Sequence, residues 1–226
     1  MEIIESLNLP VSIDTVWRFL KKYAVRRNLS MPANSSVPDV AKKRKEWNRL
    51  ISGYKSSDLV FLDESGCNTD MTRQYAYAFG GRRAKDSAPL CKPKNTTILS
   101  SIQQDGSYHY TTFSGGTTVA RFKEYLEKDL LPYLSSTSVL VMDNMKSHHA
   151  KAVKELLDNA GIHYLYLPPY SPDFNPIEKL WSKVKAILRK RKARTIDTLP
   201  DAIQAAFRLV SHSDCIGWFR SCGYSL

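Results

Sequence analysis

The sequence has 226 residues, 33 Lys and Arg against 22 Asp and Glu, a net charge of +11 and 42% hydrophobic residues. This length suits one core of ordinary size plus an appendage, and the 11% of aromatic residues exclude a wholly disordered chain. The longest apolar runs have four residues, against about 20 for a membrane-spanning helix, and the first residues lack the features of a signal peptide. We therefore expect a cytoplasmic protein that contacts no membrane.

The positive charge is concentrated at the two ends of the chain. Residues 1–57 carry 11 basic and 5 acidic side chains, residues 58–175 carry 12 and 13, and residues 176–226 carry 10 and 4. A solvated surface explains any one basic run. Two basic segments around a near-neutral centre favour a polyanion held across the mouth of the core, so nucleic acid is the expected partner.

The first part of the chain predicts two helices joined by a linker. Apolar residues recur at spacings of three and four in Val11–Tyr23, which predicts a helix. Residues 28–41 contain two prolines and a polar cluster, which are typical of a linker. A short basic helix is expected over Ala41–Ile51. Its predicted apolar contacts are Trp47, Leu50 and Ile51.

From residue 58 onward, β-branched and aromatic runs alternate with segments of helical periodicity. The predicted strands are 58–63, 74–79, 96–103, 108–113, 138–143 and 163–167. The predicted helices are 117–131, 147–160 and one that begins at Pro176. Strands joined by hairpins, followed by alternating strand and helix, predict an α/β fold with helices packed on a mixed sheet. The four cysteines lack zinc-site spacing, so we expect reduced thiols.

Three acidic residues are candidates for catalysis. Asp63 and Asp143 each end a strand that is apolar on both faces, as central strands are. If these two strands are neighbours, the two carboxylates emerge side by side at one edge of the sheet. Glu178 follows a proline-rich segment. Carboxylates at one site repel each other unless a cation lies between them, and Mg²⁺ prefers oxygen ligands. Two such ions can promote in-line attack on a phosphodiester.

Each acidic residue also has a structural interpretation. An Asp at the end of a strand is often only a turn former or a helix cap. Glu178 lies three residues after Asn175, with Pro176 between them at the first helical position, so these residues could form a capping box. The pattern alone leaves both interpretations open.

Several motifs resemble one known family. They are Asp63-Glu-Ser-Gly, Arg73 with Gly80-Gly-Arg, Val141-Met-Asp-Asn with His148, and Leu167-Pro-Pro-Tyr-Ser-Pro-Asp-Phe-Asn-Pro-Ile-Glu with Trp181. Over about residues 58–224 the chain is similar to the catalytic domain of bacterial insertion-sequence transposases of the mariner superfamily. The 34 residues between Asp143 and Glu178 equal the spacing of that family.

The resemblance implies a ribonuclease-H-like fold with a five-stranded mixed sheet. It also implies an acidic triad of Asp63, Asp143 and Glu178 that binds two Mg²⁺ or Mn²⁺ ions. The implied activity is cleavage of DNA at transposon ends and transfer of the 3′-hydroxyl into target DNA, commonly at a TA dinucleotide. The implied assembly is a homodimer on nucleoid DNA. A nuclease of the same fold and a catalytically silent DNA-binding protein derived from a mobile element are the alternatives.

The same resemblance divides the chain into three parts. Residues 1–27 would be a partial helix-turn-helix remnant, 28–57 a linker and basic helix, and 58–226 the DDE catalytic domain. The family usually carries two helix-turn-helix units, whereas only Leu9–Arg27 resembles one recognition helix, and one helix cannot form that core. We therefore expect a truncated chain, a degenerate copy or the second of two reading frames.

Four Lys and Arg residues are candidates for DNA contacts. At about 100° per residue, the helix that begins at Pro176 turns an apolar stripe toward the sheet and places Lys185 and Arg189 on the same edge as Glu178. A solubilising basic face is the alternative. Arg18 and Lys22 lie on the wetter side of the first helix.

His148 is expected at the start of the helix after Asp143. There it is either a packed or solvent-facing residue, or a contact to DNA or to a metal ligand.

Overall fold

The computed structural model describes residues 38–73 and 95–224, together with residues 12, 15, 18, 85, 87, 89 and 93. The chain forms two units, Met1–Ala33 and Asn34–Leu226. In the first unit Thr15 and Arg18 are helical, and Ser12 Oγ accepts a hydrogen bond from the Thr15 backbone N–H (3.2 Å). The rest of the first predicted helix, Lys22 included, and the predicted strand at 74–79 lie outside the described residues.

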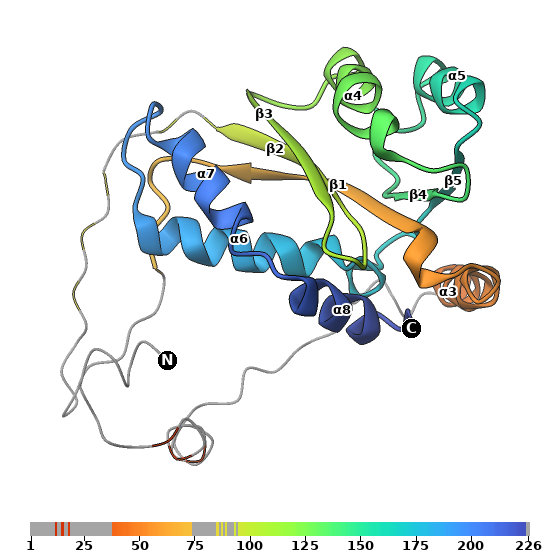
Figure 1. Cartoon of the computed structure of the whole chain (residues 1–226), viewed down its shortest axis with the longest axis horizontal. Helices are drawn as coiled ribbons and strands as arrows, with labels where there is room; N and C mark the ends of the chain where they lie inside the picture. The colour runs from red at the N-terminus through yellow and green to blue at the C-terminus, as the bar shows by residue number, and fades with distance from the viewer. Residues whose placement is uncertain are drawn as a thin grey trace. The chain divides into compact units, whose positions relative to one another are not determined.

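A five-stranded mixed sheet is the centre of the second unit, with the strand order β3-β2-β1-β4-β5 (Figure 1). The strands are β1 (Leu59–Cys67), β2 (Thr96–Ile102), β3 (Tyr108–Ser114), β4 (Val139–Met142) and β5 (His163–Tyr166). β2 pairs antiparallel with both β1 and β3, whereas β4 pairs parallel with both β1 and β5. The predicted five-stranded mixed sheet is confirmed.

Helices follow or connect these strands. They are α3 (Pro38–Ile51), α4 (Val119–Tyr125), α5 (Lys151–Asn159), α6 (Ile177–Arg191), α7 (Leu199–Phe207) and α8 (His212–Ser221). The short helical turns are η2 (Ser56–Asp58), the π-helical η4 (Leu126–Leu130), η5 (Leu131–Tyr133) and η6 (Pro172–Phe174). No helix in the described part of the chain has the length and apolar character to cross a membrane.

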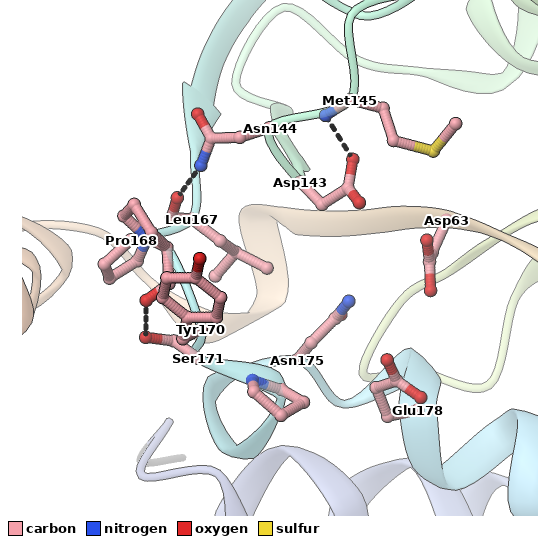
Figure 2. A pocket seen from close by; sticks show the side chains of 12 residues that line it. Asp63, Asp143, Asn144, Met145, Leu167, Pro168, Tyr170, Ser171, Asn175 and Glu178 are labelled. Atoms are coloured by element: carbon pink, nitrogen blue, oxygen red, sulfur yellow. Dashed lines mark hydrogen bonds between the residues drawn. The ribbon is translucent and has the colours of Figure 1, made fainter. Parts of the chain in front are cut away.

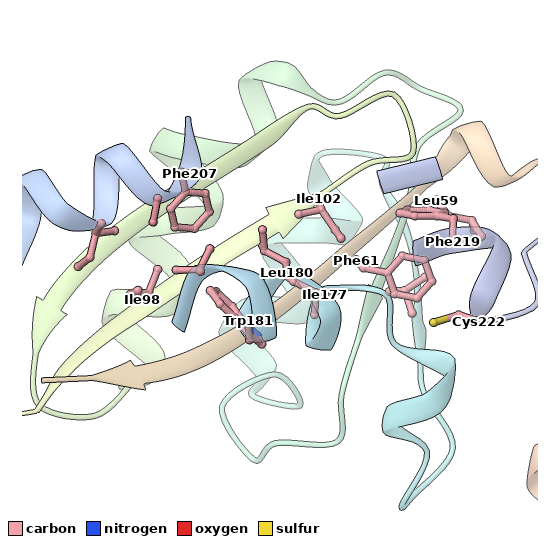
Figure 3. Close-up of a cluster of buried hydrophobic side chains, with 14 of the residues drawn as sticks. Leu59, Phe61, Ile98, Ile102, Ile177, Leu180, Trp181, Phe207, Phe219 and Cys222 are labelled. Atoms are coloured by element: carbon pink, nitrogen blue, oxygen red, sulfur yellow. The ribbon is translucent and has the colours of Figure 1, made fainter. Parts of the chain in front are cut away.

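Alternation along β1 divides the apolar residues between two cores, because successive side chains of a strand point to opposite faces. Leu59 and Phe61 pack with α6, α7 and α8 (Figure 3). Trp47 of α3 belongs to the same core. Val60 and Leu62 pack with α4, η4 and α5. Both faces of β1 are therefore covered, as its apolar sequence predicts.

The predicted apolar stripe of α6 is confirmed. Ile177, Leu180, Trp181, Val184 and Leu188 are buried, and Ile187 is partly buried against the same core. This packing fixes the rotation of α6 about its axis, and it therefore sets where the polar residues of α6 lie.

Three predicted boundaries are wrong. α3 begins at Pro38 and not at Ala41, because proline is tolerated in the first turn of a helix, and Leu50 is 47% exposed and not a core contact. β1 continues to Cys67, since the segment after Asp63 still pairs with β2. α5 begins at Lys151 and not at residue 147, because turns occupy the preceding residues.

Candidate active site

Asp63 and Asp143 occupy matching positions on neighbouring strands. The parallel pairing of β1 with β4 ends where Leu62 lies opposite Met142, and the next residue of each chain segment is an aspartate. The two strands are therefore neighbours, which is the condition for the two carboxylates to emerge side by side. Asp63 is not the last residue of its strand, however, because β1 extends past the end of β4.

A cavity of about 390 Å³ opens at this edge of the sheet (Figure 2). Asp63 from β1, Asp143 from the end of β4 and Glu178 from the first turn of α6 all line it. Its other lining residues are Asn144, Met145, Leu167, Pro168, Pro169, Tyr170, Ser171, Pro172 and Asn175. The fold thus brings the three predicted acidic residues to one cavity, although they lie far apart in the sequence.

Asp63 is the most buried of the three carboxylates, at 8% exposure. The indole Nε1 of Trp181 donates a hydrogen bond to Asp63 Oδ2 (3.1 Å). Burial raises the pKa of Asp63 to about 7, and the negative charges of Glu178 and Asp143 add to this effect. Hydrogen bonds from the Glu64 backbone and from Trp181 oppose it. Asp63 is therefore partly protonated at neutral pH.

Asp143 is held in its ionised form by two donors. Burial alone would raise the pKa of Asp143, but the hydrogen bonds from His148 and from the Met145 backbone N–H (2.9 Å) lower it. His148 Nδ1 lies 2.8 Å from Asp143 Oδ1, and His148 Nε2 lies 3.2 Å from Glu64 Oε1. Burial opposes the charged imidazole, yet these two carboxylates raise the pKa of His148 to about 10. His148 is thus a cation between two carboxylates.

The position of His148 does not support the predicted DNA contact. Its side chain is fully buried and lies in the loop before α5, with its ring 4.4 Å from that of Phe122. A buried ring leaves no surface for a phosphate. The geometry instead agrees with the alternative interpretation, in which His148 contacts a candidate metal ligand.

The capping-box interpretation of Glu178 is wrong. No side chain caps the start of α6; the Glu178 backbone N–H bonds to the Asn175 carbonyl (3.2 Å), and the buried Asn175 Oδ1 has no hydrogen-bond partner. The Glu178 side chain is exposed to the cavity. Desolvation raises the pKa of Glu178, Lys185 lowers it and the charge of Asp143 raises it further.

This set of donors fits a hard divalent cation. Three carboxylates and the Asn175 amide line the cavity, and the charge of Asp143 raises the pKa of both Asp63 and Glu178. In the described part of the chain, no three His, Cys, Asp or Glu side chains are grouped closely enough to hold an ion on their own. Mg²⁺ commonly uses one or two carboxylates together with water and substrate phosphates, so the two observations agree.

Arg44 of α3 contacts the segment that immediately precedes Glu178 and holds it in place. Its guanidinium donates to Ser171 Oγ (2.7 Å) and to Asp173 Oδ1 (2.9 Å), and lies 4.1 Å from the ring centroid of Phe174. From the other end of the unit, the Tyr224 hydroxyl donates to the Phe174 carbonyl. No sequence pattern singles out Arg44, because it is one residue within a basic run.

Two further contacts were not predicted. Glu64 Oε1 pairs with His148 Nε2, the ring nitrogen that does not face Asp143. The Asn144 side chain donates a hydrogen bond to the Leu167 carbonyl and so connects the loop after β4 to the proline-rich segment. Both residues belong to the motifs quoted above, and strand alternation could have placed Glu64 on the face opposite Asp63.

Lys185 and Arg189 lie together beside the candidate site. They line a second cavity of about 420 Å³ with the end of β1 and the loop after it. The charge of Lys185 reaches Glu178, whose pKa it lowers. Lys183 points elsewhere and pairs with Asp214. Arg18 is exposed in the first unit. The DNA-binding role of Lys185, Arg189 and Arg18 stays a prediction.

Residues 58–200 match the family described as DDE superfamily endonuclease. The chain belongs to this superfamily. The DDE chain is 23% identical to the Tc3 transposase of Caenorhabditis elegans over 232 residues, which cover 97% of the chain and 70% of the relative. It is 30% identical to the Tcb2 transposase of Caenorhabditis briggsae over 96 residues, which cover 41% of the chain and only 35% of that relative.

Solved structures of Mos1 transposase share the fold of the DDE chain. The Mos1 mariner paired-end complex with Mn superposes with a TM-score of 0.70 at 20% identity, over 97% of this chain and 69% of that one. The Mos1 catalytic domain gives a TM-score of 0.62 at 17% identity, over 87% and 91% of the two chains. The ribonuclease-H-like fold implied by the sequence motifs is confirmed.

Proposed function

We propose that this DDE chain is the catalytic part of a transposase, which cleaves DNA at transposon ends and transfers the 3′-hydroxyl into target DNA. The observation that carries the proposal is the single cavity lined by Asp63, Asp143 and Glu178 in a member of the DDE superfamily. Both curated relatives named above are transposases of transposable elements, which supports the same activity.

Asp63, Asp143 and Glu178 would hold Mg²⁺ or Mn²⁺ at the edge of the sheet. When bound, these ions activate the attacking water or 3′-hydroxyl and stabilise the leaving oxygen. The protein supplies the orientation: Trp181 holds Asp63, and His148 holds Asp143. Because the pKa of Asp63 is about 7, Asp63 would lose its proton when it ligates the ion, and binding would release a proton at neutral pH.

The proposed substrate runs along α6. Lys185 and Arg189 lie beyond Glu178 on one edge of this helix, where they would contact phosphates one or more helical turns away from the scissile one. Joining of the 3′-hydroxyl to target DNA at a TA dinucleotide and a homodimer on DNA belong to the same proposal. Mos1 has been solved as a paired-end complex and as a strand-transfer complex, which supports an assembly of that kind.

A cleavage assay tests the proposal. Labelled DNA carrying the sequences that flank the coding region is incubated with the chain, with and without Mn²⁺, beside the Asp143→Asn variant. We expect metal-dependent nicks at the element ends that the variant does not make. Binding without nicks would favour the silent DNA-binding alternative, and preferential cutting of an RNA–DNA hybrid would favour the nuclease.

A further inference from the structure

Tyr170 has a backbone conformation that bulky residues rarely adopt. Its φ is +54°, and Pro169 precedes it in the turn. A turn with proline second and a positive φ third usually has glycine at that third position. The other non-glycine residue with positive φ in the described part of the chain, Lys192, ends α6, where a left-handed residue is common. Tyr170 therefore stands where a glycine would fit without strain.

Prolines in the backbone and side-chain hydrogen bonds both restrict the loop that carries Tyr170. Prolines occupy three positions of 168–172, which restricts the backbone. Ser171 Oγ accepts a hydrogen bond from Arg44 and donates to the Pro169 carbonyl (3.1 Å). The Tyr170 side chain is nevertheless 56% exposed. The backbone of this loop is thus held in place while the Tyr170 ring stays exposed.

The ring lies on the cavity wall across from Asp63 and Glu178 (Figure 2). This cavity has two chemically different halves: carboxylates line one, and the segment 167–170, which is Leu-Pro-Pro-Tyr, lines the other. A nucleotide has the same division, with a phosphate that binds cations and a flat base that stacks on aromatic rings. A volume of about 390 Å³ lies within the range of about 300–1,000 Å³ that small-molecule sites occupy.

We infer that Tyr170 is a stacking platform for an unpaired nucleobase of the strand whose phosphate meets the three carboxylates. The inference rests on the proposed function, because it places a DNA strand in this cavity. Stacking on an exposed aromatic ring accepts any base and makes no sequence-specific contact. A base that leaves the duplex loses its stacking on its neighbours, and the Tyr170 ring replaces that contact.

Binding of a short single strand tests the inference without requiring cleavage. The full chain is titrated in Mg²⁺ with a labelled oligonucleotide of about eight thymidines and with an abasic strand of the same length. We expect wild type and Tyr170→Phe to bind the thymidine strand at least about tenfold more tightly than the abasic strand. Tyr170→Gly should lose most of this difference and bind the abasic strand as wild type does.

The stability of Tyr170→Gly separates stacking from packing. Glycine suits the positive φ, so the thermal midpoint of this variant should equal or exceed that of wild type. Tyr133→Ala, which removes an exposed aromatic ring outside this cavity, should leave the preference for bases unchanged. An unchanged preference in Tyr170→Gly, or a marked loss of its stability, would overturn the inference. A wild type that prefers bases but cuts no transposon end would instead refute the proposed function alone.

Discussion

Replacing Asp63 by Asn should stabilise the metal-free protein at neutral pH. The folded-state pKa of Asp63 is about 7, against an ordinary value of 3.8, and a tenfold change in proton affinity is worth about 1.4 kcal/mol. The folded state binds this proton more tightly than the unfolded state, so stability falls as the pH rises from about 4 to about 7. The total loss is about 4 kcal/mol, and Asp63→Asn, which cannot ionise, avoids it.

Asp143→Asn is the matched control, and it should change stability in the opposite direction. The pKa of Asp143 is lowered by its partners, so its ionised form stabilises the fold above its ordinary pKa, and this stabilisation is lost as the pH falls. The amide cannot form the ion pair with His148, which leaves the buried imidazolium with Glu64 alone. Asp143→Asn should therefore destabilise the protein at neutral pH.

Urea denaturation in EDTA measures both effects at about pH 4.5 and about pH 7.5. The stability difference between Asp63→Asn and wild type should grow from about 1 kcal/mol at pH 4.5 to about 4 kcal/mol at pH 7.5. Added Mn²⁺ should stabilise wild type and neither variant, because a ligand that binds only the folded state raises its stability. If Asp63→Asn is less stable than wild type at pH 7.5, or if their stability difference does not depend on pH, Asp63 is not a buried carboxylate with a raised pKa, and the reasoning is refuted.

Three further changes probe the surroundings of the site. Replacing Lys185 and Arg189 by Ala should lower the log–log salt slope of DNA binding by about 2, at about 0.9 per lost phosphate contact. Arg44→Ala should cost about 1 kcal/mol of stability in urea unfolding, because hydrogen bonds from a half-exposed ion pair are lost. His148→Asn should weaken Mn²⁺ binding, followed by calorimetry, about tenfold or more, since partners of a ligating carboxylate such as Asp143 fix its orientation.

Each of these changes has a control in the chain. Lys179 and Arg191 lie on α6 outside the second cavity, and equal loss of salt slope from that pair would mean a diffuse basic surface. Lys43→Ala, on an exposed position of α3, should leave stability unchanged. His149→Asn removes the exposed neighbour of His148 and should leave Mn²⁺ affinity unchanged; if it weakens binding equally, the buried ring is not the cause.

The sequence predicted the parts of the site that depend on local patterns. Apolar runs located β1 and β4, and helical periodicity located the buried face of α6. The end of β1 was misplaced because its last residues are held by pairing with β2, a contact that local composition does not encode. The alternative capping box of Asn175 and Glu178 failed for a similar reason, since the Asn175 side chain turns away from the helix start in its tertiary setting.

Contacts between distant segments could not be predicted. Arg44 and Asp173 are 129 positions apart, and no periodicity of a single segment links them. The sequence pattern likewise does not distinguish Asp63 from Asp143, because each is an acidic residue at the predicted end of an apolar strand. Burial raises the pKa of Asp63, whereas hydrogen bonds from His148 and from the Met145 backbone lower the pKa of Asp143, and no local sequence pattern encodes this difference.

The contact of Arg44 with the segment before Glu178 has a consequence for where this fold can be joined to other domains. The family match begins at residue 58, but Arg44, which holds the segment before Glu178, lies upstream of that point, in α3. Tyr224, well past the end of the match, holds the same segment from the other side. A recombination junction at residue 58 would thus separate the segment before Glu178 from Arg44. Stable fusions to new DNA-binding domains should therefore join upstream of Pro38.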